Sequence, residues 1–132
     1  MAALTRDRNT PRQDANLVAV PVEASTKIHA GSLVVANAAG YAAPGTTSTV
    51  IRYIGRAEET VDNTGGARGA KLVTVRRLSA FKWANDGSIT QTHLMEIAYI
   101  VDDQTVSSTD GTSTRSVAGI IVGVDPDGVW VE

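Results

Sequence analysis

The side chains best suited to catalysis or metal binding are spaced in ways that favour neither. Adjacent carboxylates occur at Glu58-Glu59 and at Asp102-Asp103. Neighbouring side chains of an extended strand point to opposite faces, so neither pair presents two carboxylates to one substrate unless a turn separates them. The two histidines, His29 and His93, have no further ligands at the spacing of a zinc or facial-triad site. We therefore predict no catalytic site, no metal site and no cofactor.

Three further motifs match known sites only in part. Asp125-Pro126-Asp127-Gly128 resembles the start of an EF-hand loop, but the later glutamate and the flanking helices are missing, so we interpret it as a turn. No serine lies in a G-x-S-x-G elbow. The glycine-rich segment 65–71 lacks the order of a phosphate-binding loop. We predict a flexible hairpin loop there, in which Arg68 and Lys71 are candidate contacts to a protein partner.

Arg76-Arg77, together with Phe81 and Trp83, could form a basic and aromatic surface of the kind that binds single-stranded nucleic acid. The formal net charge of the chain is −2, however, and aromatic residues make up only 5% of it. Such a chain has no surplus of positive charge for a polyanion, so we predict no nucleic-acid partner. The alternative is that both aromatic side chains anchor the core while one arginine faces solvent or a partner.

Length and composition define the class of protein further. A chain of 132 residues is expected to form one domain, and the absence of cysteine excludes disulfides and cysteine-based zinc sites. The N-terminus lacks the apolar stretch of a signal peptide, and no run approaches the roughly 18–20 apolar residues of a membrane-spanning helix. We expect a soluble, non-enzymatic protein made in a cytoplasm, with no membrane partner. A small hydrolase that uses Glu58 or Asp102 is an alternative, and it requires two carboxylates to converge in a pocket.

From Leu17 onward the sequence has the pattern of short β-strands. Alternation predicts a strand over 17–22, and Pro21 places it at a sheet edge or at a bulge because proline has no N–H to donate. The longest extended segment, 71–83, changes register, for which a bulge near Arg76-Arg77 is one explanation. Further strands are expected over 32–37, 41–43, 49–57 and 96–101, and a C-terminal hairpin over 117–124 and 129–131, closed by a type I turn.

Helical signals are weak. One or two turns are expected over 90–95, where Ser88 and Gln91 have capping-box spacing. About seven or eight short strands remain, which favours a mostly β fold: a small barrel or sandwich of short antiparallel strands. The apolar residues are largely small or β-branched, so we expect modest stability as a monomer and additional stabilisation by oligomerisation or docking.

The first fifteen residues differ from the rest, and we predict an extended N-terminal arm over 1–15 followed by a single β domain over 16–132. The arm has one isolated Leu4, no periodicity and several charged side chains. It is either a disordered terminus or a segment that orders against a neighbouring chain, for example by adding a strand to a sheet edge. Its candidate contact residues are Arg6, Arg8, Thr10, Pro11 and Arg12.

Five segments of the sequence, taken in order, resemble capsid decoration or cement proteins, which are small head proteins of tailed phages and Mu-like prophages. They are Asp7-Arg8-Asn9-Thr10-Pro11-Arg12; Ala30-Gly31-Ser32-Leu33-Val34 with Gly40-Tyr41; Gly55-Arg56-Ala57-Glu58-Glu59 with Val61-Asp62-Asn63-Thr64; Ala98-Tyr99-Ile100-Val101-Asp102-Asp103-Gln104-Thr105-Val106; and Arg115-Ser116-Val117-Ala118-Gly119.

This resemblance implies a β-rich fold, often described as tulip-like or as a small barrel. It also implies a structural protein of the virion, bound to the outer surface of an icosahedral capsid, where it reinforces contacts between major capsid proteins. Such proteins commonly bind as homotrimers at three-fold positions and use an N-terminal arm, which corresponds here to residues 1–16. We expect Arg6, Arg8 and Arg12 to pair with acidic groups or backbone carbonyls of the capsid. The alternative is a tail or fibre-base binding module of the particle.

Overall fold

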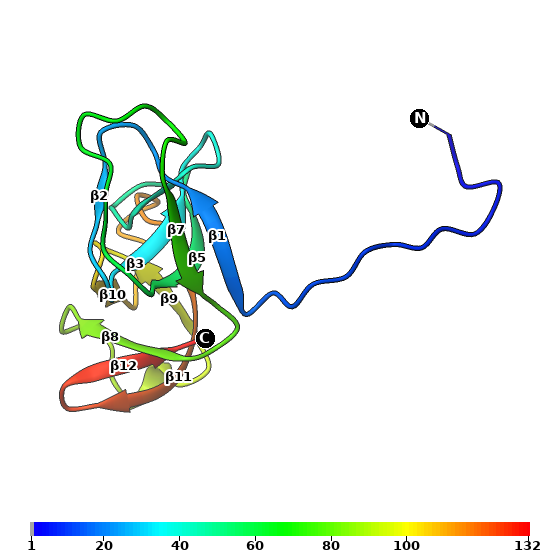
Figure 1. The fold of residues 1–132 in the computed structure, drawn as a ribbon. Coiled ribbons are helices and arrows are strands. Elements are labelled where there is room, and N and C mark those ends of the chain that lie inside the picture. The colour runs from blue at the N-terminus through cyan, green and yellow to red at the C-terminus, as the bar shows by residue number, and fades with distance from the viewer. Residues whose placement is uncertain (1) are drawn as a thin grey trace.

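The computed structural model describes residues 2–132; Met1, the first residue of the predicted arm, lies outside the described residues. Residues 2–132 form twelve strands and one short 3₁₀ turn (Figure 1). The elements are β1 Leu17–Pro21, β2 Lys27–Ile28, β3 Leu33–Ala36, β4 Ala42–Pro44, β5 Arg52–Ala57, β6 Val61–Asp62, β7 Leu72–Arg76, β8 Phe81–Asn85, η1 Gln91–His93, β9 Ile97–Ile100, β10 Thr105–Ser107, β11 Val117–Asp125 and β12 Gly128–Val131.

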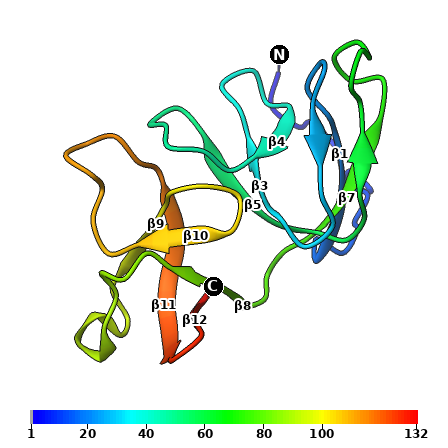
Figure 2. The same cartoon turned by 90° about the vertical axis from the view of Figure 1, so that its left-hand side faces the viewer.

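The strands form an open sheet, a closed barrel and a small two-stranded sheet. The open sheet has the order β1-β7-β5-β3-β4, the barrel has the order β10-β8-β12-β11-β9, and β2 pairs with β6. Figure 2 shows the open sheet and the barrel side by side. The predicted fold class, mostly β with a small barrel, is confirmed. Strand pairing is antiparallel between the described strands except for β8 and β10, which run parallel.

Strand β3 lies between two hydrophobic cores and is buried on both faces. Leu33 and Val35 belong to the core of the barrel, which also contains Phe81 and Trp83. Val34, between them, belongs to the core of the open sheet, which contains only small or β-branched apolar residues. Alternate side chains of a strand point to opposite faces, so a continuous apolar run is what a strand shared by two cores requires.

The segment 71–83 is not one strand with a bulge, as the sequence suggested, but two strands in different sheets. Strand β7 ends at Arg76 and pairs with β1 and β5, whereas β8 begins at Phe81 and pairs with β12 and β10. The turn between them includes Leu78, whose φ of 60° is in the left-handed region. The register change was therefore predicted in the right place. The alternation of side chains along a strand does not indicate which other strand that strand pairs with.

The C-terminal hairpin and the edge position of the first strand are confirmed. Asp125 pairs with Gly128 across a two-residue turn in which neither Pro126 nor Asp127 has a positive φ, which excludes types I′, II and II′. Strand β1, with Pro21 at its end, pairs only with β7 at one edge of the open sheet.

The helical turn also lies where it was expected, but its cap differs. Thr90, not Ser88, is the N-cap, and its N–H donates to Nδ1 of His93 at 2.9 Å. The Ser88 hydroxyl instead bonds the Asp86 carboxylate at 2.6 Å.

Candidate functional site

The N-terminal arm has no role in packing the β domain. Residues 2–16 are exposed and contain no strand, and the arm extends away from the domain (Figure 1). Its side-chain contacts are local: Arg8 Nη1 donates to Thr10 Oγ1, and Arg12 pairs with Asp14, each at 3.1 Å. The arm joins the domain where the Arg77 N–H donates to the Asn16 carbonyl at 2.9 Å. Its charged groups are therefore accessible to another molecule.

The strand that follows the arm offers a free edge. Arg77 donates to the Asn16 carbonyl and Val22 donates to the Lys71 carbonyl, so even-numbered residues of β1 form the narrow hydrogen-bonded pairs with β7. The backbone groups of Leu17 and Ala19 consequently point away from the sheet. An extended chain could add to this edge, and Pro21, which has no N–H, limits its length.

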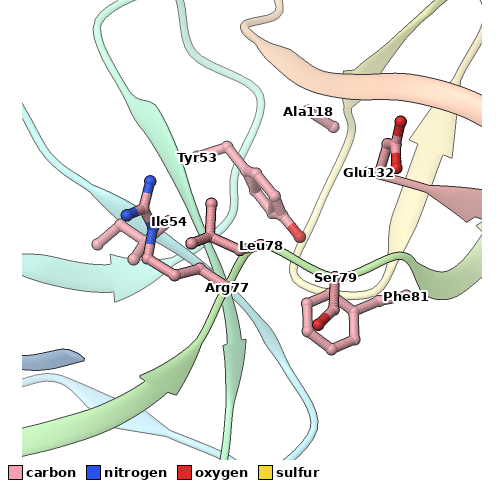
Figure 3. Close-up of a pocket in the computed structure, with 8 residues that line it drawn as sticks. All are labelled: Tyr53, Ile54, Arg77, Leu78, Ser79, Phe81, Ala118 and Glu132. Atoms are coloured by element: carbon pink, nitrogen blue, oxygen red, sulfur yellow. The ribbon is translucent and has the colours of Figure 1, made fainter. Parts of the chain in front are cut away.

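A hollow of about 450 Å³ lies at the junction of the open sheet and the barrel. Figure 3 shows that Tyr53 and Leu78 lie beside it, with Arg77 on one side and Glu132 on the other. Leu78, in the turn between the two sheets, is 70% exposed. The lining combines apolar walls with charged rims, which suits a contact with a protein segment better than proton-transfer chemistry.

Within this hollow, the Tyr53 phenol has a raised pKa. Burial raises its pKa to about 12, and the nearby Trp83 indole and Arg56 offset only part of the increase. The hydroxyl and the indole Nε1 are both buried in an orientation that does not make a regular hydrogen bond. A phenol with so high a pKa stays protonated at neutral pH, so it cannot act as a base there.

The carboxylates proposed for a hydrolase are bound by other groups. Glu58 Oε1 accepts from Arg56 at 2.7 Å and from Arg76 at 2.9 Å, and these bonds, led by Arg56, lower the pKa of the carboxyl. Asp102 accepts the N–H of Gln104 at 2.9 Å. The lowered pKa of Glu58 is the opposite of what a general acid needs at neutral pH. Within residues 2–132, no group of three or more acidic or histidine side chains could hold a metal ion.

The predicted loop contacts, Arg68 and Lys71, both have internal partners. Arg68 bonds both carboxylate oxygens of Glu23 at 2.8 and 3.0 Å, and its guanidinium lies 4.9 Å from the centre of the Tyr41 ring. Lys71 Nζ donates to the Asp62 carbonyl at 2.6 Å. The buried Asn63 amide donates to the carbonyls of Glu23 and Ala67. These bonds give the loop a fixed shape, and its contact with a partner stays a prediction.

The structure regroups the basic residues that the sequence placed together. Arg77 lies at the junction hollow, whereas Arg76 lies in a separate groove with Arg56 and Lys82. Arg56 and Lys82 lie on β5 and β8, and nothing in the sequence pattern groups them with Arg76. The pairing of β5 with β7 brings Arg56 next to Arg76, and the turn from β7 into β8 brings Lys82 to the same groove.

Among the described residues, no helix has the length and apolar character needed to cross a membrane. Comparison of the chain with protein-family models, curated proteins and solved structures finds no match. The function is therefore inferred from the residues and geometry of the chain itself.

Proposed function

We propose that this chain is a non-enzymatic structural protein of a phage virion that binds the outside of an icosahedral capsid and reinforces contacts between major capsid proteins. The observation that carries the proposal is the exposed arm, residues 2–16, which is joined to a β domain that packs without it. An exposed, charged segment of this length contributes nothing to the folded domain and is well suited to bind a neighbour.

The arm would bind by ordering on the capsid surface. Arg6, Arg8 and Arg12 supply charge-assisted hydrogen bonds to carboxylates or carbonyls. Pro11 restricts the backbone near Thr10, so less entropy is lost when the arm becomes ordered. The remaining entropic cost lowers the affinity of one arm, and several arms acting together would compensate for it. A homotrimer at a three-fold position of the shell would supply three arms.

The β domain would cover the seam between capsid subunits. Several of its apolar side chains are exposed, including Val50, Leu72, Leu78, Met95 and Val117. Burial of these dispersed apolar residues beneath a neighbouring surface would stabilise the complex. Each copy would contribute a modest interface, and many copies would together stabilise the shell.

The test is to purify particles from the phage that encodes the chain, label the chain with a gold-conjugated antibody and locate it by electron cryomicroscopy. We expect the label and matching density on the outer face of the head, at three-fold positions. Label confined to the tail or the fibre base would replace this proposal with that of a tail module. Particles that lack the chain altogether would contradict both.

A further inference from the structure

We infer that the groove between the open sheet and the barrel binds an acidic, extended segment of a partner protein. That this partner is the capsid shell rests on the function proposed above, whereas the preference of the groove for carboxylates rests on its own geometry. The groove has a volume of about 400 Å³ and is lined by residues of β5, β7, β8 and β12.

Three cations line the groove, and the two carboxylates that pair with them, Glu58 and Asp127, are not among its lining residues. Arg56, Arg76 and Lys82 line it together with Ser79 and Ala80 of the turn before β8. Glu58 and Asp127 offset part of this charge, so the groove keeps a small excess of positive charge in a protein whose formal net charge is −2. Such a groove attracts a negatively charged segment and repels a positively charged one.

These cations keep donors available for a ligand. The side chains of Arg56, Arg76 and Lys82 are 39%, 36% and 34% exposed. Each arginine gives one hydrogen bond to Glu58, and a guanidinium has five N–H groups. Lys82 pairs with Asp127 at 2.8 Å, but that carboxylate is 72% exposed and its attraction is screened by solvent. A partner's carboxylates could therefore bind these side chains without disturbing the hydrophobic cores of the domain.

Aromatic rings hold two of these cations in position. The Arg56 guanidinium lies 4.8 Å from the centre of the Phe81 ring, and Lys82 Nζ lies 5.8 Å from the Trp130 ring. The Trp130 indole donates in turn to Asp125 at 2.8 Å. Cation–π contacts of this kind restrict long side chains before the ligand arrives, which lowers the entropic cost of binding.

The same aromatic residues argue against nucleic acid as the ligand. Phe81 is 7% exposed, with Arg56 over its ring, and Trp83 is 4% exposed, so neither side chain offers an open aromatic face. Trp130, at 39%, offers one exposed ring, and Lys82 lies over it. Single-stranded nucleic acid binds through several open aromatic faces in series, whereas an acidic peptide needs only the cations.

The probe is a fluorescein-labelled ten-residue peptide of alternating glutamate and glycine, measured by fluorescence anisotropy at low and moderate salt. We expect saturable binding that weakens with salt. The double variant Arg76→Gln/Lys82→Gln should lower the affinity about tenfold or more. Lys27→Gln/Arg52→Gln removes the same charge at exposed positions outside the groove and should change it less than twofold. Circular dichroism checks that both variants fold.

A zero-length carbodiimide crosslink on the unmodified protein makes the test independent of variants. The peptide should link to Lys82, and a link to Lys27 or Lys71 instead would overturn the inference. Absence of binding would overturn it too, as would tighter binding of a ten-nucleotide oligothymidylate than of the peptide.

The inference and the proposed function can fail separately. If the chain decorates the head but the peptide does not bind, the groove assignment is wrong and the virion function stands. If the peptide binds at Lys82 but particles carry no label on the head, the groove assignment stands and the partner is not the shell.

Discussion

The arm and the β domain of this chain differ in how much of their surface is buried. The domain buries the cores of its open sheet and its barrel, and β3 serves both. The arm, residues 2–16, buries nothing and meets the domain only at its last residues. The comparison teaches that the domain folds without the arm, which leaves the arm available for binding. Changes in the arm should therefore leave stability unchanged, whereas changes in the domain can alter stability or, at the groove, binding.

The largest expected effect is in the core of the barrel. Trp83 is 4% exposed and packs against Phe81, with ring centres 6.0 Å apart. Trp83→Ala should lower the free energy of unfolding by about 3–5 kcal/mol, because it removes a large buried side chain and leaves a cavity. Urea denaturation followed by circular dichroism measures this. A loss below about 1 kcal/mol would mean that the barrel is not packed as described.

A smaller effect is expected in the core of the open sheet. Val34 is fully buried, and Val34→Ala should cost about 1–3 kcal/mol through lost burial and a small cavity. Val50→Ala is the matched control, since it makes the same chemical change at a side chain that is 63% exposed. The control should change stability by less than about 0.5 kcal/mol. Equal effects at the two positions would contradict the burial of Val34 in the core of the open sheet.

The next effect is on how the free energy of unfolding falls at acid pH. Hydrogen bonds from Arg68, then from the Ala24 N–H and Asn37, lower the pKa of Glu23 from 4.5 to about 2. A depressed carboxyl pKa stabilises the fold above the unfolded value, and this contribution is lost as the pH falls from about 4.5 through 2.

Glu23→Gln should therefore flatten the loss of stability in that pH range. Asp14→Asn, in the arm, should not, because Asp14 and its partner Arg12 are 80% and 85% exposed. Thermal melts at a series of pH values compare the two variants. A curve for Glu23→Gln that matches the parent would show that the Arg68 pair has no part in the acid response.

The smallest expected effect on stability comes from the deletion of most of the arm. Removal of residues 2–14 should leave the circular dichroism spectrum unchanged and the unfolding free energy within about 0.5 kcal/mol, because none of these residues packs on the domain. Amide hydrogen exchange of β1 and β7 should also stay the same. A drop of several degrees in melting temperature would show that the arm supports the fold after all.

Local chemistry made much of this architecture predictable. Pro21 marked an edge strand, and Asp125-Pro126-Asp127-Gly128 marked the C-terminal hairpin, because each depends on residues close in sequence. The partners of 71–83 were not predictable, since alternation is the same whichever sheet a strand enters. The basic groove was missed for a related reason: Arg56 meets Arg76 only through the pairing of β5 with β7, and Lys82 joins them from the next strand, β8.

The most direct test of the central claim uses the same deletion on assembled particles. Purified protein is added to heads that lack the chain, and bound copies are counted by sedimentation and electron microscopy. The separation of folding from binding predicts that the protein without residues 2–14 folds normally and fails to decorate the heads. Decoration by the shortened protein at the level of the full chain would contradict it.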